Sequence, residues 1–119
     1  MSGLSMPRRV EKPWGHELIW ADTELYVGKI LHVRAGHALS LQYHEYKDET
    51  MHLLHGRMRL FVGASADALA EVVLDEGESI RILPGTVHRV EAITDVDILE
   101  ASTAHLDDVI RLEDRYGRS

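Results

Sequence analysis

Short runs of alternating apolar and polar residues, separated by Gly, Asp and Pro, follow one another along most of this chain. An alternation of period two predicts β-strands with one buried and one solvated face. Strands are expected at 18–20, 25–33, 39–45, 50–56, 58–63, 71–75, 79–83, 88–93 and 97–102, with a hairpin loop at 64–69 and a tight turn at 75–77. Many short strands at close spacing favour an all-β sandwich or barrel.

The two ends of the chain depart from this alternation. Residues 1–10 are expected to form a loose N-terminal arm. In the segment 105–119, Asp107 or Asp108 could cap a short helix, and Gly117 would follow its end. A chain of 119 residues can enclose one core and not two, so residues 1–119 are predicted to form a single domain.

Composition excludes several classes of function. The formal net charge is -7, and the basic stripe that neutralises phosphates in nucleic-acid binding proteins is missing, so we expect no nucleic-acid partner. No apolar run approaches the roughly 20 residues that span a bilayer, and no signal peptide is recognised, so no membrane partner is expected. The chain contains no Cys, which excludes disulfides and thiolate sites, and a cytoplasmic location is the default expectation.

The stretch from Gly36 to Gly56 has the spacing of a metal site. Gln42 and His44 lie two residues apart, so both side chains leave the same face of an extended strand. Glu49 follows after about the distance needed to turn a corner and enter the neighbouring strand. An imidazole, a carboxylate and an amide oxygen from two adjacent strands would suit a divalent ion such as Zn, Mn, Fe, Co or Ni.

A fourth ligand is expected in the second half of the chain. Pro84 and Gly85 predict a sharp reversal after the strand at 79–83. His88 opens the next strand and could point back at the metal ion. The alternative is a buried polar network of the same residues that holds no metal.

These two segments resemble the two motifs of the cupin superfamily, whose members are small double-stranded β-helix (jelly-roll) barrels that carry one metal ion inside. The resemblance rests on Gly36, His44, Glu49 and Gly56 in the first motif, and on Gly77, Gly85 and His88 in the second. The chain departs from the usual motifs where Gln42 replaces a histidine and Ala92 an asparagine. A set of Gln, His, Glu and His is similar to the zinc ligands of phosphomannose isomerases.

A closer resemblance covers about residues 12–118. The chain looks like the C-terminal isomerase domain of bifunctional mannose-1-phosphate guanylyltransferase/mannose-6-phosphate isomerase enzymes. The segments that carry it are KPWG at 12–15, GKILHVRAG at 28–36, LSLQYH at 39–44, PGTVHRVE at 84–91 and DDVIRLEDRYGR at 107–118. The resemblance implies one divalent metal ion, most simply zinc, held by Gln42, His44, Glu49 and His88. It also implies interconversion of mannose 6-phosphate and fructose 6-phosphate.

Such an isomerisation needs a base that moves a proton between adjacent carbons, and cations that bind the phosphate. Glu100 is the predicted base, because it alternates with Val96 and Ile98 and should share their inward face. The alternative is that this strand faces the other way and Glu100 is solvated. Lys29 is the predicted catalytic and substrate-binding cation, although the sequence leaves open whether it faces the lumen or the solvent. Arg89 is a second substrate-binding candidate, and its position directly after His88 favours a rim or salt-bridge role. The tail arginines are further candidates for the phosphate: Arg111, Arg115 and Arg118.

A small sugar phosphate is therefore the expected partner, and a homodimer the expected assembly, because open sheets have edges and apolar faces to cover. Two other functions remain open at this point. One is a metal-dependent oxygenase, and the other is a non-catalytic module that binds a sugar or metabolite.

Overall fold

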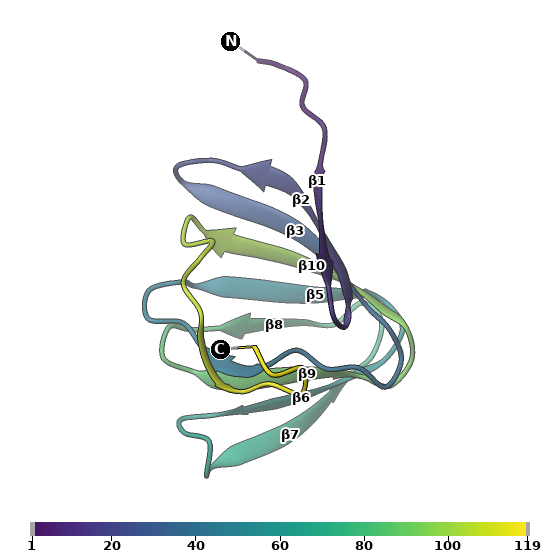
Figure 1. The fold of residues 1–119 in the computed structure, drawn as a ribbon, viewed down its shortest axis with the longest axis vertical. Coiled ribbons are helices and arrows are strands. Elements are labelled where there is room, and N and C mark those ends of the chain that lie inside the picture. Colours follow the sequence, from purple (N-terminus) through teal and green to yellow (C-terminus); the bar gives the residue numbers. More distant parts are fainter. Residues whose placement is uncertain (1, 119) are drawn as a thin grey trace.

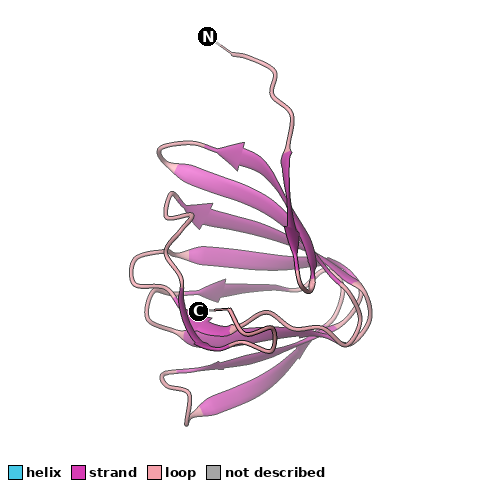
Figure 2. Cartoon of the chain, viewed as in Figure 1, coloured by secondary structure: helices cyan, strands magenta, loops and turns pink. Residues whose placement is uncertain are grey.

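The protein is described by a computed structural model of residues 2–118, and all of its regular structure is β-strand (Figure 2). The strands are β1 (Arg8–Lys12), β2 (Gly15–Asp22), β3 (Tyr26–Val33), β4 (Leu41–Tyr43), β5 (Glu49–His55), β6 (Met58–Gly63), β7 (Leu69–Leu74), β8 (Ser79–Ile82), β9 (Val87–Ala92), β10 (Val96–Thr103) and β11 (Ile110–Glu113). None of the described residues forms a helix that could cross a membrane.

The strands form two antiparallel sheets. The six-stranded sheet has the order β1-β2-β3-β10-β5-β8, and the five-stranded sheet has the order β11-β4-β9-β6-β7. Figure 1 shows β2, β3, β10, β5 and β8 one below another, with β9, β6 and β7 beneath them. Neighbours within a sheet are often distant in sequence, because the chain crosses repeatedly from one sheet to the other.

The interior has an apolar part and a polar part. Leu53, Met58, Leu60, Val96 and Ile98 are fully buried and belong to one continuous apolar cluster. A second set of buried residues is charged or polar: Lys29, Ser40, His44, Lys47, Glu49, His88, Glu100 and Ser102. Burial of so many ionisable groups is costly unless they are paired or bind a ligand. The polar part of the interior is therefore the candidate site.

The predicted strands are confirmed with small changes at their ends, and the tail is the main correction. The helix predicted within 105–119 does not form in the described part of that segment, 105–118, where β11 pairs with β4. The β-branched Val109 and Ile110 suit a strand, and the strand bonds that β4 offers outweigh the local capping signal of Asp108. The predicted N-terminal arm is shorter than expected, since β1 begins at Arg8. Met1 and Ser119, at the outer ends of the predicted arm and tail, lie outside the described residues.

Candidate metal centre

A cavity of about 400 Å³ opens between the two sheets and contains the candidate site. Its walls come from β1, β2 and β3, from β4 and β5, from β10, and from the segment 106–111 that leads into β11. Of the residues predicted to act in the site, Lys29, Gln42, His44, Glu49 and Glu100 all line this cavity.

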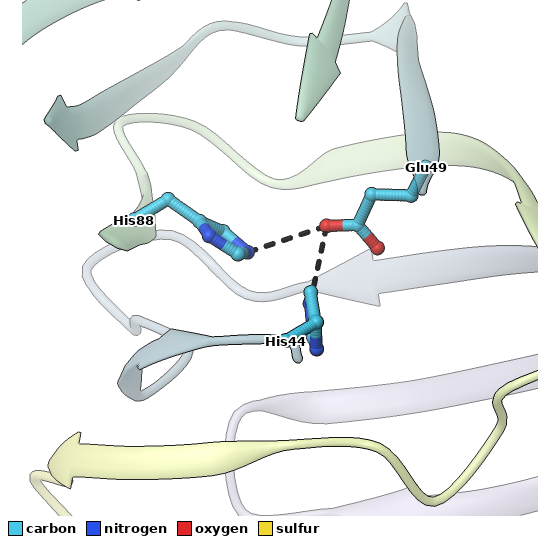
Figure 3. Close-up of side chains that lie close together, drawn as sticks. All are labelled: His44, Glu49 and His88. Carbon is cyan, nitrogen blue, oxygen red and sulfur yellow. Dashed lines mark ion pairs between the residues drawn. The ribbon is translucent and has the colours of Figure 1, made fainter. Parts of the chain in front are cut away.

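His44, Glu49 and His88 lie close together (Figure 3), and the first two of them line the cavity. His44 follows the end of β4, Glu49 begins β5, and His88 is the second residue of β9. Glu49 Oε1 lies 3.4 Å from His44 Nε2 and 3.2 Å from His88 Nε2. One ligand atom from each residue lies within 4.8 Å of the others, which is a spacing that a single metal ion can bridge.

The hydrogen bonds of the two imidazoles determine which nitrogen faces the centre. His44 Nδ1 donates to the main-chain oxygen of Asp108, and His88 Nδ1 donates to that of Thr86 at 2.9 Å. A carbonyl oxygen can only accept, so in a neutral ring the proton lies on Nδ1 and Nε2 carries a lone pair. His44 Nε2 is buried without a hydrogen-bond partner among the described residues.

Nε2 of His44, Nε2 of His88 and a Glu49 carboxylate oxygen therefore face one another, either as an ion pair between protonated imidazole and carboxylate or as the donor set of a metal ion. The pKa of Glu49 reflects the same surroundings. Burial raises it, but the contacts with His44 and His88 and the positive charge of Lys47 outweigh burial and lower it below the ordinary value. The carboxylate stays ionised, and the donor set fits a divalent metal ion of the nitrogen- and oxygen-binding kind.

A chain of alternating charges continues from Glu49 along the cavity wall. Lys47 Nζ lies 3.1 Å from Glu49 Oε2 and 3.4 Å from Glu100 Oε2. Lys29 Nζ lies 3.9 Å from Glu100 Oε2 and 3.3 Å from Glu17 Oε2. Each buried charge thus has neighbours of the opposite sign, which offsets part of its desolvation cost.

Glu100 has a perturbed pKa within this chain. Burial, and then the negative charge of Glu49, raise its pKa to about 7, although Lys47 and Lys29 oppose the rise. For Lys47, burial lowers the pKa, but the charges of Glu100 and Glu49 outweigh burial and raise it above the ordinary value. A buried carboxyl with a pKa near neutrality is suited to exchanging a proton with a ligand in the cavity.

The remaining predicted residues are placed as follows. Gln42 lies on β4 directly opposite His88 on β9, and its side-chain oxygen accepts a hydrogen bond from Ser40. Arg89 does not line the cavity, because its guanidinium bonds the main-chain oxygens of Leu39 and Glu113 and the Glu113 carboxylate.

The three tail arginines divide between the cavity and the outside. Arg111 and Arg118 line the cavity, and Arg118 also bonds the Asp114 carboxylate. Arg115 pairs with Glu91 instead. We assign no substrate-binding role to Arg89 or Arg115, whose guanidinium groups are bound elsewhere.

The expectation that His44 and Glu49 come from adjacent strands is wrong. β4 belongs to the five-stranded sheet and β5 to the six-stranded sheet, and β4 pairs with β9 and β11. The residues between them cross from one sheet to the other, so His44 and His88 approach from one sheet while Glu49 approaches from the facing one. The site thus joins both walls of the barrel.

Sequence reasoning missed three residues of the site: Lys47, Glu17 and Asp108. Lys47 lies between His44 and Glu49 in a segment whose sequence indicates only a connection between two strands. Glu17 alternates with Ile19 on β2, a pattern that could have predicted an inward carboxylate. The local sequence around Asp108 indicates only a possible helix cap and carries no signal that its main-chain oxygen reaches His44.

Known proteins resemble this chain over most of its length. The family model described as "Mannose-6-phosphate isomerase C-terminal" matches residues 2–114. The chain belongs to this family. The match covers both motif segments, Gly36–Gly56 and 77–88, together with most of the tail.

Curated relatives are longer proteins. "Mannose-1-phosphate guanylyltransferase ManC" of Salmonella typhimurium (strain LT2) is 32% identical over 118 residues, which cover 95% of this chain and 24% of that protein. The "Mannose-1-phosphate guanylyltransferase" of Escherichia coli (strain K12) is 31% identical, with 93% of this chain and 23% of the relative covered. The chain thus spans about a quarter of these relatives.

Solved structures share the fold. KdgF from Halomonas sp. superposes with a TM-score of 0.70 at 15% identity, and the superposition covers 82% of this chain and 88% of the KdgF chain. The oxalate decarboxylase of Lactobacillus farciminis superposes with a TM-score of 0.75 at 17% identity, and the superposition covers 89% of this chain and 33% of the decarboxylase chain. The predicted cupin fold is confirmed.

Proposed function

We propose that this protein is a metal-dependent isomerase of a sugar phosphate and interconverts mannose 6-phosphate and fructose 6-phosphate in its cavity. The observation that carries the proposal is the position of Glu100, a buried carboxyl with a pKa of about 7, which lines the cavity together with His44 and Glu49 of the candidate metal site. Membership of the mannose-6-phosphate isomerase C-terminal family supports the choice of substrate.

The metal ion would be held by His44 and His88 through Nε2 and by Glu49 through its carboxylate, with Gln42 as the fourth ligand. A bound divalent ion, zinc in our proposal, would act as a Lewis acid toward sugar oxygens. The chain contributes two hydrogen bonds, in which each Nδ1–H group donates to a main-chain carbonyl oxygen. They keep both Nε2 lone pairs directed at the metal position.

Proton transfer is assigned to Glu100. In the aldose-to-ketose direction its carboxylate removes the proton from carbon 2 and returns it to carbon 1. The hydroxyl proton moves from the oxygen on carbon 2 to the oxygen on carbon 1, so no atom is gained or lost. Lys29 and Lys47 flank the carboxylate and stabilise its charged form before the first transfer and after the second, while between the two transfers Glu100 holds the proton as a neutral carboxyl group.

Phosphate binding would depend on cations gathered in the cavity of an acidic protein. Six basic residues line it: Arg8, Lys12, Lys29, Lys47, Arg111 and Arg118. They come from β1, from β3, from the segment between β4 and β5, and from the tail. We assign the phosphate to Lys29 and the cavity-lining tail arginines. Lys47 is left out because one of its two carboxylate neighbours is the proposed metal ligand Glu49.

The test is an assay of purified protein, stripped of metal and reloaded separately with zinc, manganese, cobalt or nickel. Mannose 6-phosphate should be converted to fructose 6-phosphate, and the reverse, only in loaded samples. Lack of interconversion with every metal would overturn the proposal. Binding of either sugar phosphate without turnover would indicate a non-catalytic binding module, and oxygen uptake by an iron-loaded sample would indicate an oxygenase.

We further propose a cytoplasmic homodimer. The chain has no Cys, which suits a reducing compartment, and large apolar side chains remain exposed on β2, β3 and β7, among them Trp20, Tyr26 and Val72. Sedimentation at micromolar concentration tests the assembly, and a monomer throughout would contradict it.

A further inference from the structure

The connection from His44 to Glu49 joins two of the proposed metal ligands and carries Lys47 between them. It contains no regular structure, so its conformation depends on what it contacts. The segment that follows β10 lies against it. The Asp108 carboxylate accepts hydrogen bonds from three consecutive main-chain N–H groups of this connection: Glu45 at 3.0 Å, Tyr46 at 2.7 Å and Lys47 at 2.9 Å.

The main chain of Asp108 also contacts the centre directly. Its carbonyl oxygen accepts the Nδ1 proton of His44. Asp108 thus binds the proposed metal ligand His44 through its main chain. Its side chain binds the connection that follows His44. A shift of Asp108 would move the His44 ring and the main chain of Lys47 together.

The Asp108 carboxylate is ionised in this arrangement. Burial raises its pKa, but the hydrogen bonds from Tyr46, Glu45 and Lys47 outweigh burial and lower it. Charge-assisted hydrogen bonds of this kind are shorter and stronger than neutral ones. They reduce the number of conformations open to the connection before any metal ion binds.

We propose that Asp108 is a positioning residue of the metal centre. Asp108 orients His44 Nε2 and places Lys47 beside Glu49. The inference rests on the metal centre of the proposed function and goes beyond it, because it makes the tail part of that centre. The alternative is that Asp108 only anchors the tail.

Other contacts of the tail separate these two roles. The Tyr116 hydroxyl hydrogen-bonds His37 at 2.6 Å, and Arg89 bonds Glu113 at 3.1 Å. β11 also pairs with β4. The tail is therefore expected to stay attached when only the Asp108 carboxylate is removed. A variant that lacks this carboxylate tests whether it positions His44 and the connection that follows.

The experiment compares D108A with D107A in the full chain. Asp107 is the neighbouring residue, is exposed and carries the same charge, so D107A controls for the loss of one negative charge near the cavity. Metal-free samples are titrated with Zn²⁺ against a competing chelator. We expect D108A to bind Zn²⁺ about 10–100-fold more weakly than wild type, as for other outer-sphere partners of a metal ligand, and D107A to bind within about twofold.

Cobalt(II) absorption gives a second readout, since it reports the geometry of the ligands. D108A should change this spectrum and D107A should not. If D108A does not fold, D108N replaces it, because Asn keeps one acceptor oxygen and lacks the charge. It should then bind Zn²⁺ more weakly than D107A.

The outcomes distinguish the two proposals. If wild type binds Zn²⁺ and the Asp108 variants match it in affinity and spectrum, the positioning role is wrong and the proposed isomerase stands. If wild type binds no metal while remaining folded, the metal centre itself is wrong and both proposals fail.

Discussion

At the scale of single residues, the metal centre depends on two imidazoles whose Nδ1 protons are already bound. His44→Ala removes one of the two proposed nitrogen ligands, and we expect metal affinity to fall by at least about 100-fold, because loss of even an outer-sphere partner costs about 10–100-fold. Metal content after dialysis, measured by elemental analysis, checks this result.

His52→Ala is the matched control for this substitution. His52 alternates with Met51 and Leu53 on β5, is half-buried and bonds Ser79 at 2.7 Å away from the centre. Its loss should leave the metal content unchanged. Equal metal content in the His44 and His52 variants would contradict the assignment of His44 as a ligand.

Glu100 is the residue on which turnover depends. Glu100→Gln keeps the shape of the side chain but removes its ability to accept a proton, and a positioned acid or base contributes about 10²–10⁴-fold to a rate. We expect kcat for isomerisation to fall by about that factor while the stoichiometry of bound metal stays the same. Steady-state kinetics with mannose 6-phosphate provide the measurement.

Glu71→Gln serves as the control for Glu100. Glu71 is exposed on β7, where it pairs with Arg59 at 2.8 Å, and it does not line the cavity. The kcat of the Glu71→Gln variant should equal that of wild type. A Glu100 variant that turns over as fast as the Glu71 variant would show that another group moves the proton.

At the scale of elements, the turn between β5 and β6 carries the chain from one sheet to the other. Gly56 in this turn has a φ of 93°, and a Cβ there would lie 2.2 Å from the Asp95 carbonyl oxygen. Gly36 has a φ of 80° and no atom within 4 Å of its Cβ position. The two glycines thus share the strained backbone but differ in the space beside it.

Substitution by Ala separates these two effects. Gly36→Ala should lower the free energy of unfolding by about 1–2 kcal/mol, the cost of a left-handed backbone. Gly56→Ala should lose about 1–3 kcal/mol more, because the added methyl group forces the turn apart. Denaturant unfolding measures both, and equal losses would show that the turn relaxes without cost.

At the scale of the whole molecule, the proposed metal ion links the two sheets, since His44 and His88 belong to one wall and Glu49 to the other. Metal should therefore stabilise the folded chain as a unit. At a free concentration about 100 times Kd, the gain is about 2.7 kcal/mol. For a domain of this size, the midpoint of thermal unfolding should rise by on the order of 10 °C.

Calorimetry with and without Zn²⁺ measures this shift. A double variant, His44→Ala with His88→Ala, is the control, and its midpoint should not depend on Zn²⁺. A rise of the same size in the double variant would place the bound metal elsewhere in the molecule.

The sequence alone determined what depends on neighbouring residues. Strands follow from period-two alternation because successive side chains leave opposite faces, and so the inward position of Glu100 beside Val96 and Ile98 could be predicted. Pro84 and Gly85 likewise predicted the turn that brings His88 into β9. The motif segments were enough to name His44, Glu49 and His88 together.

Only the tertiary structure decided which elements face one another. Local alternation carries no information about strand pairing between distant segments, so the sequence could not show that β4 and β5 lie in opposite sheets or that the tail forms a strand. Lys47 is buried only because Glu49 and Glu100 converge on it from two strands. The contact of Asp108 with His44 spans 64 residues and exists only when the tail returns to β4. The alternation of residues specified the strands, and the packing of the two sheets assembled the site.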